Sequence, residues 1–181
     1  MSRDLVKISK FLRLVLRHKP EEIGLVLDGS GWTSIEDPVR LANQHGTRLT
    51  RELVQKIVAE NDKQRFAISE DGLRIRANQG HSIAIDLGLN PSTPPLLLYH
   101  GTASRFIDSI QETGLHSANR QHVHLSPDHS TATKVGQRHG QPLVLTVRSG
   151  AMAAAGHLFY LSNNEVWLTD RVPVNYIEFP P

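Results

Sequence analysis

The sequence predicts an α+β protein of two lobes, a helical N-terminal lobe that ends in a β-hairpin and a C-terminal lobe made mostly of strands. The hydrophobic spacing changes from helical to strand-like along the chain, and a proline-rich break, Asn90-Pro91-Ser92-Thr93-Pro94-Pro95, separates the two regions. Three prolines within five residues cannot continue a helix or a central strand. We therefore expect lobes at residues 1–90 and 91–181, both within the usual size range of a domain.

Apolar residues recur at helical spacing in three stretches of the first lobe. The first helix is expected to follow Ser2 as N-cap and to end near His18, because Pro20 disfavours helix in the residue before it. The other two expected helices are residues 38–44, beginning at Pro38, and residues 51–60, capped by Thr50.

A β-hairpin is expected at the end of the first lobe, where residues 65–68 and 73–76 alternate around Asp71-Gly72. Three helices followed by a hairpin is the element order of a winged helix. Beyond the break, one helix is expected over residues 104–113, ended by Gly114. The expected strands of the second lobe are residues 96–100, 122–125, 143–147, 165–168 and 174–179.

The composition excludes several classes of protein. The chain is 39% hydrophobic and 21% charged, which is typical of a soluble protein with a core. It has no cysteine, so disulfides, Cys-ligated zinc, iron–sulfur clusters and thiol nucleophiles are excluded. The basic, amphipathic first residues differ from a secretory signal, and no apolar run reaches the roughly 18 residues of a membrane span. We expect a cytoplasmic protein with no membrane partner.

The charge distribution is only slightly basic. The formal net charge is +2, with 14 Lys+Arg against 12 Asp+Glu in residues 1–90 and six of each in residues 91–181. A nucleic-acid site would therefore have to be a local cluster of basic residues, since no broadly basic surface is indicated.

Arg65 and Arg76 lie on one face of the predicted hairpin. With a loop over Ser69–Gly72, Arg65 sits opposite Arg76. With a two-residue turn at Asp71-Gly72, Arg65 faces Asn78 and Arg76 lies diagonal to it. The pattern alone favours solvated arginines that point into water. The functional interpretation is a bound anion that neutralises the pair, since guanidinium groups match phosphate oxygens in bidentate fashion.

Arg17-His18 at the end of the first predicted helix leaves a similar choice open. Basic residues in a last turn interact favourably with the helix dipole, and this alone would explain them. Neighbouring residues point about 100° apart on a helix, so both could face one ligand only if the end is frayed.

Ten histidines raise the question of a metal site. His122 and His124 share one face of a predicted strand and His129 follows, but no carboxylate or cysteine completes a familiar ligand spacing, so no metal is expected. At His100-Gly101-Thr102 a buried-type strand ends, and the glycine allows either close approach of a ligand or a plain strand-to-loop junction.

Several short segments are familiar as an ordered set: Leu-Arg-His-Lys-Pro (16–20), Asp-Lys-Gln-Arg-Phe (62–66), Ile-Arg-Ala-Asn-Gln-Gly-His-Ser (75–82), Leu-Tyr-His-Gly-Thr (98–102), Arg-Gln-His-Val-His-Leu-Ser (120–126) and Asn-Glu-Val-Trp-Leu-Thr (164–169). In this order and spacing the chain resembles the NAD-dependent RNA 2′-phosphotransferase family, which includes the tRNA-splicing phosphotransferase of eukaryotes and the KptA proteins of bacteria. Each segment alone is weak, but together they cover essentially the whole chain.

The resemblance implies a winged-helix-like N-terminal lobe and an ADP-ribosyltransferase-like C-terminal lobe, which form a cleft for RNA and NAD. In the implied first step an RNA 2′-phosphate attacks C1″ of the nicotinamide ribose and nicotinamide leaves. In the second, the ribose O2″ attacks phosphorus and releases 2′-hydroxyl RNA and ADP-ribose 1″,2″-cyclic phosphate. The implied partners are a tRNA-like RNA with a 2′-phosphate and NAD, which is consumed, with no metal; we expect a monomer.

The family's catalytic set falls on Arg17, His18, Arg65 and Arg120. His18 is either the proton donor to the leaving RNA oxygen or a hydrogen-bond donor to the phosphate. The resemblance further suggests neighbouring RNA phosphate contacts at Arg76 and His81. The implied NAD-binding residues are His100, Gly101, Thr102, His124, Ser126, Gly136 and Arg138.

Many protein-modifying ADP-ribosyltransferases carry a catalytic glutamate near the third motif, where this sequence has Val166 next to Glu165. If Val166 points inward, no carboxylate activates a protein acceptor, which favours a phosphate acceptor. If the strand phase differs by one residue, Glu165 points inward and the inference fails.

Two alternatives are kept open. The first is a transferase that leaves ADP-ribose on a terminal phosphate of a nucleic acid. The second is a non-catalytic winged-helix regulator, which would need an exposed basic helix near residues 50–60. The mixed charges of that segment, Arg51-Glu52-Leu53-Val54-Gln55-Lys56, do not favour it, because duplex binding depends on phosphate neutralisation.

Overall fold

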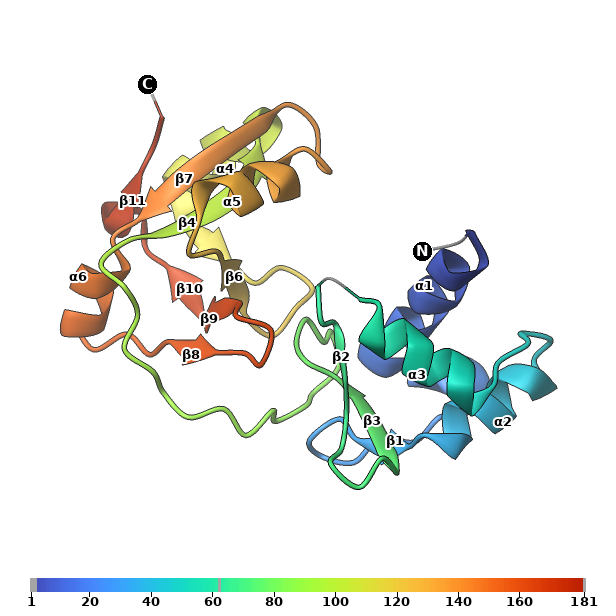
Figure 1. The fold of residues 1–181 in the computed structure, drawn as a ribbon. Helices are drawn as coiled ribbons and strands as arrows, with labels where there is room; N and C mark the ends of the chain where they lie inside the picture. Colours follow the sequence, from blue (N-terminus) through green and yellow to red (C-terminus); the bar gives the residue numbers. More distant parts are fainter. Residues whose placement is uncertain (1–2, 62, 181) are drawn as a thin grey trace. The chain divides into compact units, whose positions relative to one another are not determined.

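The computed structural model describes residues 3–61 and 63–180, which form two compact units, residues 1–88 and 89–181 (Figure 1). Each unit mixes helices with small sheets and has its own hydrophobic core. The division falls close to the predicted proline-rich break. Ser2, the expected first N-cap, lies outside the described residues.

Unit 1 consists of three helices and a three-stranded antiparallel sheet in the order β1-β3-β2. Its elements are α1 (Arg3–Arg17), η1 (Pro20–Ile23, a 3₁₀ turn), β1 (Thr33–Ser34), α2 (Glu36–Gln44), α3 (Arg51–Ala59), β2 (Phe66–Ile68) and β3 (Arg74–Ala77). The short strand β1 was not expected; it pairs with β3 and extends the hairpin to a sheet.

The three predicted helices are present, with one correction. The first ends at Arg17 as expected, and the hydroxyl of Thr50 caps the third by accepting from Leu53 N at 3.2 Å. The second begins at Glu36 and not at Pro38. Proline is tolerated anywhere in the first turn, where no amide donor is needed, and two carboxylates ahead of it interact favourably with the helix dipole.

The hairpin adopts the register in which Arg65 faces Asn78, since Phe66 pairs with Ala77 and Asn78 N donates to Arg65 O at 3.0 Å. This register was expected with a two-residue turn at Asp71-Gly72, but the loop is longer. Ser69 N donates to Arg74 O at 3.0 Å, so four residues connect the strands. The direct Arg65–Arg76 pairing is therefore wrong, and the diagonal arrangement is confirmed.

Unit 2 is built on the long antiparallel pair of β4 and β7, over which α5 packs (Figure 1). Three small sheets have the strand orders β11-β7-β4, β6-β9-β8 and β10-β5. The elements are β4 (Leu98–Ala103), η2 (Ser104–Phe106), α4 (Ile107–Thr113), β5 (Leu115–His116), β6 (Val123–Leu125), α5 (His129–Gly136), β7 (Pro142–Val147), α6 (Ser149–Ala154), β8 (Tyr160–Leu161), β9 (Trp167–Thr169), β10 (Arg171–Val172), η3 (Val174–Tyr176) and β11 (Ile177–Glu178).

Several expectations for this unit need correction. His100, Gly101 and Thr102 lie inside β4, so they do not form a strand-to-loop junction. The strand expected over residues 174–179 is a 3₁₀ turn followed by the two-residue β11. Helices α5 and α6 were not expected at all. No helix within the described ranges is long and apolar enough to cross a membrane.

Candidate functional site

Arg17 is the most deeply buried residue of the predicted catalytic set. Its side chain is only 7% exposed, and its Nη2 donates to the carbonyl oxygen of Arg65 at 3.1 Å. Its own carbonyl accepts from Ser82 N at 2.9 Å. The end of α1 is thereby held both by the start of the hairpin and by the segment that follows β3. A buried guanidinium fixed in this way keeps a permanent positive charge at a defined position.

His18 and Arg65 lie beside this anchor. His18 Nδ1 is 3.0 Å from the hydroxyl of Ser82, and Arg65 Nη1 donates to Asn61 Oδ1 at 3.3 Å. The side chain of Arg17 contacts the Arg65 carbonyl and the ring of His18 contacts the Ser82 hydroxyl, so the two neighbours have different side-chain partners. Both nevertheless contact one small region, because Ser82 meets the backbone of the first and the ring of the second. Unit 1 therefore brings together three of the four residues of the predicted catalytic set.

Arg76 joins the cluster from the middle strand of the sheet. Its guanidinium carbon lies 4.7 Å from the centre of the Trp32 ring, within cation–π range. Burial lowers the pKa of Arg76, and the charge of Asp28 opposes that shift. Its side chain shares the outer face of the hairpin with Arg65, in the diagonal relation that the register requires.

His81 lies close to Arg17, His18 and Arg76, with 1% of its surface exposed. Burial, followed by the positive charges of Arg17, His18 and Arg76, lowers its pKa to about 4, although the carbonyl of Leu16 favours protonation. Neither ring nitrogen makes a hydrogen bond of regular geometry. The ring is therefore neutral near pH 7 and withdrawn from solvent, which does not favour the expected direct contact with an RNA phosphate.

In unit 2, His100 of β4 contacts the backbone of His124 in β6. His100 Nδ1 lies 3.0 Å from the carbonyl oxygen of His124. A neutral imidazole nitrogen must donate to a carbonyl, so the proton of His100 is on Nδ1. Burial lowers the pKa of His100, the His124 carbonyl opposes this, and the charges of His139 and Arg120 lower it further. The ring therefore stays neutral at physiological pH.

Arg120, the fourth residue of the predicted set, contacts the ring of His124 through Nη1 and Nδ1. Because an arginine N–H can only donate, Nδ1 of His124 accepts and the proton of the neutral ring sits on Nε2. Arg120 is the predicted catalytic arginine of this motif, and His124 is its predicted nicotinamide-side histidine. Their side chains are in direct contact.

Gly101 and Gly136 have a structural explanation. A Cβ on Gly101 would lie 1.8 Å from the carbonyl oxygen of Ala132 in α5, and one on Gly136 would lie 2.5 Å from that of Thr102 in β4. The two glycines allow the backbones of helix and strand to approach each other closely. At Gly101 the close approach that a glycine allows is made by the backbone of α5.

The remaining predicted NAD-binding residues, Thr102, Ser126 and Arg138, lie in or next to β4 and α5. Thr102 is 5% exposed within β4, whereas Arg138 is exposed beyond the end of α5. Ser126 exchanges two backbone hydrogen bonds with Tyr99, each 2.8 Å long, so it is tied to β4 beside His100.

Glu165 lies in the turn between β8 and β9. Its φ of 60° is left-handed, Glu165 N donates to Ser162 O at 2.9 Å, and its side chain is exposed. Val166 is partly buried and its carbonyl accepts from Ser162 N at 3.0 Å. The strand thus begins only after both residues, at Trp167.

Some supporting residues escaped prediction. Asn61 and Ser82 hold Arg65 and His18, and Trp32 stacks on Arg76. Ser82 lies within a segment already singled out next to His81, which was the available signal. No sequence pattern indicated Trp32 or Asn61, because their contacts with Arg76 and Arg65 form only when the chain folds. Within residues 3–61 and 63–180, no cluster of three metal-ligating His, Asp or Glu side chains occurs.

Comparison with known proteins links these residues to one family. Residues 3–171 match the sequence model described as RNA 2′-phosphotransferase, Tpt1/KptA family. A protein of Rhodopirellula baltica named probable RNA 2′-phosphotransferase is 53% identical over 98% of this chain and 97% of its own length. Proteins of the same name from Flavobacterium johnsoniae and Agrobacterium fabrum are 54% and 56% identical, covering 99% and 93% of the chain and 99% and 91% of their own lengths.

Proposed function

This chain belongs to the Tpt1/KptA family of RNA 2′-phosphotransferases, and we propose that it removes an internal RNA 2′-phosphate by transferring it to NAD. The RNA phosphate attacks C1″ of the nicotinamide ribose and the bond to nicotinamide breaks. The ribose O2″ then attacks phosphorus, and the RNA 2′-oxygen leaves with a proton. The products are nicotinamide, 2′-hydroxyl RNA and ADP-ribose 1″,2″-cyclic phosphate.

The observation that carries the proposal is the convergence of Arg17, His18, Arg65 and Arg76 in unit 1 from three separate parts of the chain. After burial, the charges of Arg17, His18 and Arg76 contribute to the low pKa of the neighbouring His81. A region where several fixed positive charges meet favours an anion of high charge density, such as a phosphate dianion. We propose that unit 1 is a winged-helix-like lobe that holds the RNA 2′-phosphate.

This chemistry suits a site built from arginines. The nucleophile of the first step is already an anion, so it needs positioning more than it needs a base. The second step develops charge on phosphorus, which fixed guanidinium donors stabilise. We assign Arg17, Arg65 and Arg120 to that role, and His18 to proton donation to the leaving oxygen or to a hydrogen bond with the phosphate. His81, which is buried near Arg17 and Arg76, would not contact the phosphate directly.

We further propose that unit 2 is an ADP-ribosyltransferase-like lobe that binds NAD. His100 and Thr102 of β4 and His124 and Ser126 of the β6 segment would face the ADP-ribose and the nicotinamide ribose, with Arg138 as a further phosphate contact. Gly101 and Gly136 support this surface by letting α5 approach β4. The exposed position of Glu165 in a turn is consistent with a phosphate acceptor that needs no activating carboxylate.

The test is incubation of the protein with an oligonucleotide that carries one internal 2′-phosphate, with and without NAD. We expect loss of the phosphate only with NAD, and one ADP-ribose cyclic phosphate for each nicotinamide released. Phosphate loss without NAD, or none in either reaction, would contradict the proposal. Accumulation of an ADP-ribosylated RNA that never resolves would favour the alternative of a transferase that caps terminal phosphates. The tRNA-like substrate, the cytoplasmic location and the monomeric state stay predictions.

A further inference from the structure

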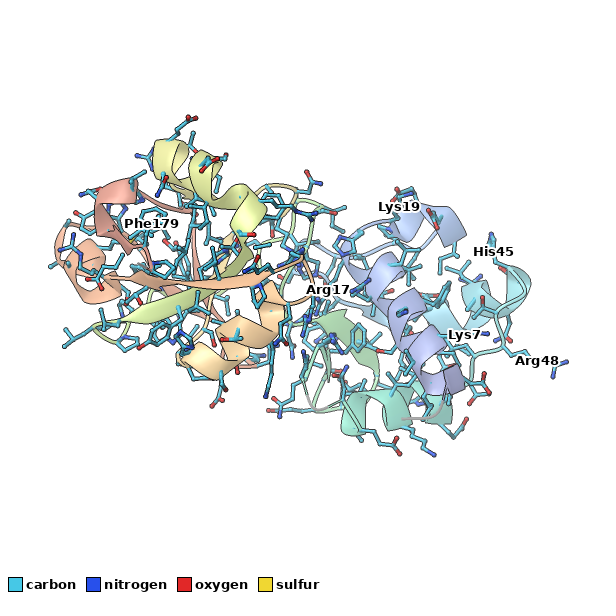
Figure 2. The ribbon with its side chains drawn as sticks, turned by 90° about the horizontal axis from the view of Figure 1, so that it is seen from above. Lys7, Arg17, Lys19, His45, Arg48 and Phe179 are labelled. Carbon is cyan, nitrogen blue, oxygen red and sulfur yellow. The ribbon has the colours of Figure 1, made fainter. Side chains whose placement is uncertain are left out.

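Helix α1 carries exposed basic residues along the same side that ends in Arg17. Lys10 and Arg13 are both exposed, and at 100° per residue they lie within about 40° of Arg17 around the helix axis. We call Lys10 and Arg13 the α1 stripe. Figure 2 shows Arg17 at one end of the helix and Lys7, which flanks the stripe, nearer the other. The stripe therefore leads along the helix to the anchored arginine.

The charges of the α1 stripe differ from those of the other two helices of unit 1. Arg40 of α2 pairs with Asp37 at 3.1 Å, and Lys56 of α3 pairs with Glu60 at 3.8 Å. Within the part of the chain that the structure describes, neither Lys10 nor Arg13 forms an ion pair with a carboxylate. The one carboxylate of α1, Asp4, points to another side of the helix.

A regulator of the winged-helix type would use α3 to bind nucleic acid, and that helix is unsuited to the task. Arg51 at its start pairs with Glu36 at 2.8 Å and also donates to Gly72 O at 2.8 Å. Its apolar residues Val54 and Ile57 are fully buried in the core of unit 1. Of these two helices, α1 and not α3 presents exposed basic residues without a carboxylate partner in the part of the chain that the structure describes.

The spacing of the stripe suits a polyanion that continues beyond the 2′-phosphate. At 1.5 Å per residue, Arg13 lies about 6 Å and Lys10 about 10 Å from Arg17 along the axis. Long, flexible Lys and Arg side chains at these distances reach successive phosphates of one strand, and each neutralised phosphate releases counterions. A nucleoside that carries only a 2′-phosphate has no second phosphate to reach these side chains.

Resting on the proposed function, we propose that Lys10 and Arg13 bind the backbone phosphates of the RNA nucleotides next to the 2′-phosphorylated one. The stripe then determines how much better a long RNA binds than a minimal substrate. It takes no part in the chemical steps, so it should act on KM for long RNA and leave kcat unchanged.

The test compares the double variant Lys10→Gln/Arg13→Gln with the wild type on two substrates, a 2′-phosphorylated dinucleotide and a 2′-phosphorylated single strand of about ten nucleotides. For the long strand we expect KM to rise about tenfold or more, and the slope of log KM against log salt to fall by about 1.4, since each single-strand phosphate contact contributes about 0.7. For the dinucleotide, which keeps a single backbone phosphate, the rise in KM should be several-fold smaller than for the long strand, and kcat should stay within twofold. The matched control is Arg40→Gln/Lys56→Gln, which removes the same charge from α2 and α3 and should leave both substrates unaffected.

Unchanged KM for the long strand, equal losses on both substrates, or an equal loss in the control variant would each overturn the proposal. If the wild type turns over neither substrate, the proposed function itself has failed. The stripe is then judged from fluorescence anisotropy of a labelled single strand of the same length. In that arm, equal affinity of the double variant and the wild type would overturn it.

Discussion

The two units of this protein prepare their candidate sites by different physical means. In unit 1, side chains from distant segments meet: Arg17 reaches the carbonyl of Arg65, and His18 reaches the hydroxyl of Ser82. In unit 2, the backbone determines the shape, because Gly101 and Gly136 let α5 lie directly on β4. The first arrangement concentrates positive charge, whereas the second provides a rigid surface with neutral imidazoles.

The difference indicates how each unit should respond to mutation. A substitution in the arginine cluster should mainly reduce phosphate binding or rate, since the fold of unit 1 rests on a separate apolar core. A substitution at the helix–strand contact of unit 2 should reduce stability first. Arg120 is the exception in unit 2, because in the proposed function it acts on the transferred phosphate.

The largest effect is expected for Arg120→Ala. Loss of a donor that stabilises charge on the transferred phosphate should lower kcat by about 100- to 1,000-fold, which corresponds to about 3–4 kcal/mol. The measurement is the single-turnover rate with a 2′-phosphorylated oligonucleotide and saturating NAD. Arg105→Ala is the control, since Arg105 is exposed and stacks on Phe106 within the same unit. A rate near that of the wild type would remove Arg120 from the catalytic set.

A comparable but purely structural loss is expected for Gly101→Ala. The new Cβ would overlap the carbonyl oxygen of Ala132, so α5 must move away from β4. We expect the free energy of unfolding to fall by about 3 kcal/mol, at the upper end of the overpacking range. Urea denaturation followed by circular dichroism measures it. Gly29→Ala in unit 1 is the control, because its Cβ would meet nothing within 4 Å. Equal stability of the two variants would contradict the packing role.

A smaller, pH-dependent effect is expected for His81→Gln. The pKa of His81 is about 4 in the folded protein and near 6.5 when unfolded, so the unfolded state binds more protons between these values. The stability that the neutral ring provides is fully present above pH 6.5 and is lost as the pH falls towards 4, by about 2–3 kcal/mol.

The variant should remove this part of the pH dependence, measured as unfolding free energies at pH 7.5, 5.5 and 4.5. A shallower decline should remain, because the pKa of His100 in unit 2 is lowered in the same direction. Measurement at pH 7.5, where the wild-type ring is neutral in both states, reports any loss of packing separately. An unaltered pH dependence in the variant would show that His81 is not the buried titrating group described here.

The smallest effect is expected at the ion pair of Arg51 and Glu36. These side chains are partly exposed, at 35% and 58%, so their coupling free energy in a double-mutant cycle should be below about 1 kcal/mol. Arg51→Ala and Glu36→Ala, singly and together, are compared by thermal unfolding. A coupling of several kcal/mol would mean that unit 1, like unit 2, depends on a specific contact outside its apolar core.

The helices of unit 1 could be predicted because their signals are local. The apolar period of α1 and the cap at Thr50 involve residues within a few positions of each other. The hairpin register could only be narrowed to two alternatives, because the loop length that decides it depends on hydrogen bonds of Ser69. Helix α5 was missed since its threonines and glycine give no strong helical period.

The candidate site was predicted unevenly for the same reason. The diagonal relation of Arg65 and Arg76 follows from strand alternation and was one of the two expected arrangements. The contacts of Arg17 with the Arg65 carbonyl and of His18 with Ser82 join residues 48 and 64 positions apart, which no local pattern reveals. The burial of His81 was likewise invisible, because a polar residue in a loop-like segment is ordinarily expected at the surface.

We propose that unit 1 binds the RNA 2′-phosphate and unit 2 binds NAD. Binding measurements on Arg65→Gln test this assignment most directly. Titration calorimetry would measure its affinity for NAD, for an oligonucleotide with an internal 2′-phosphate, and for the same oligonucleotide with a 2′-hydroxyl. We predict that NAD affinity stays within twofold of the wild type. The preference for the phosphorylated oligonucleotide should fall by about tenfold or more, as expected for one charge-assisted contact. An equal loss of NAD affinity, or an unchanged preference for the phosphate, would contradict the assignment of phosphate binding to unit 1.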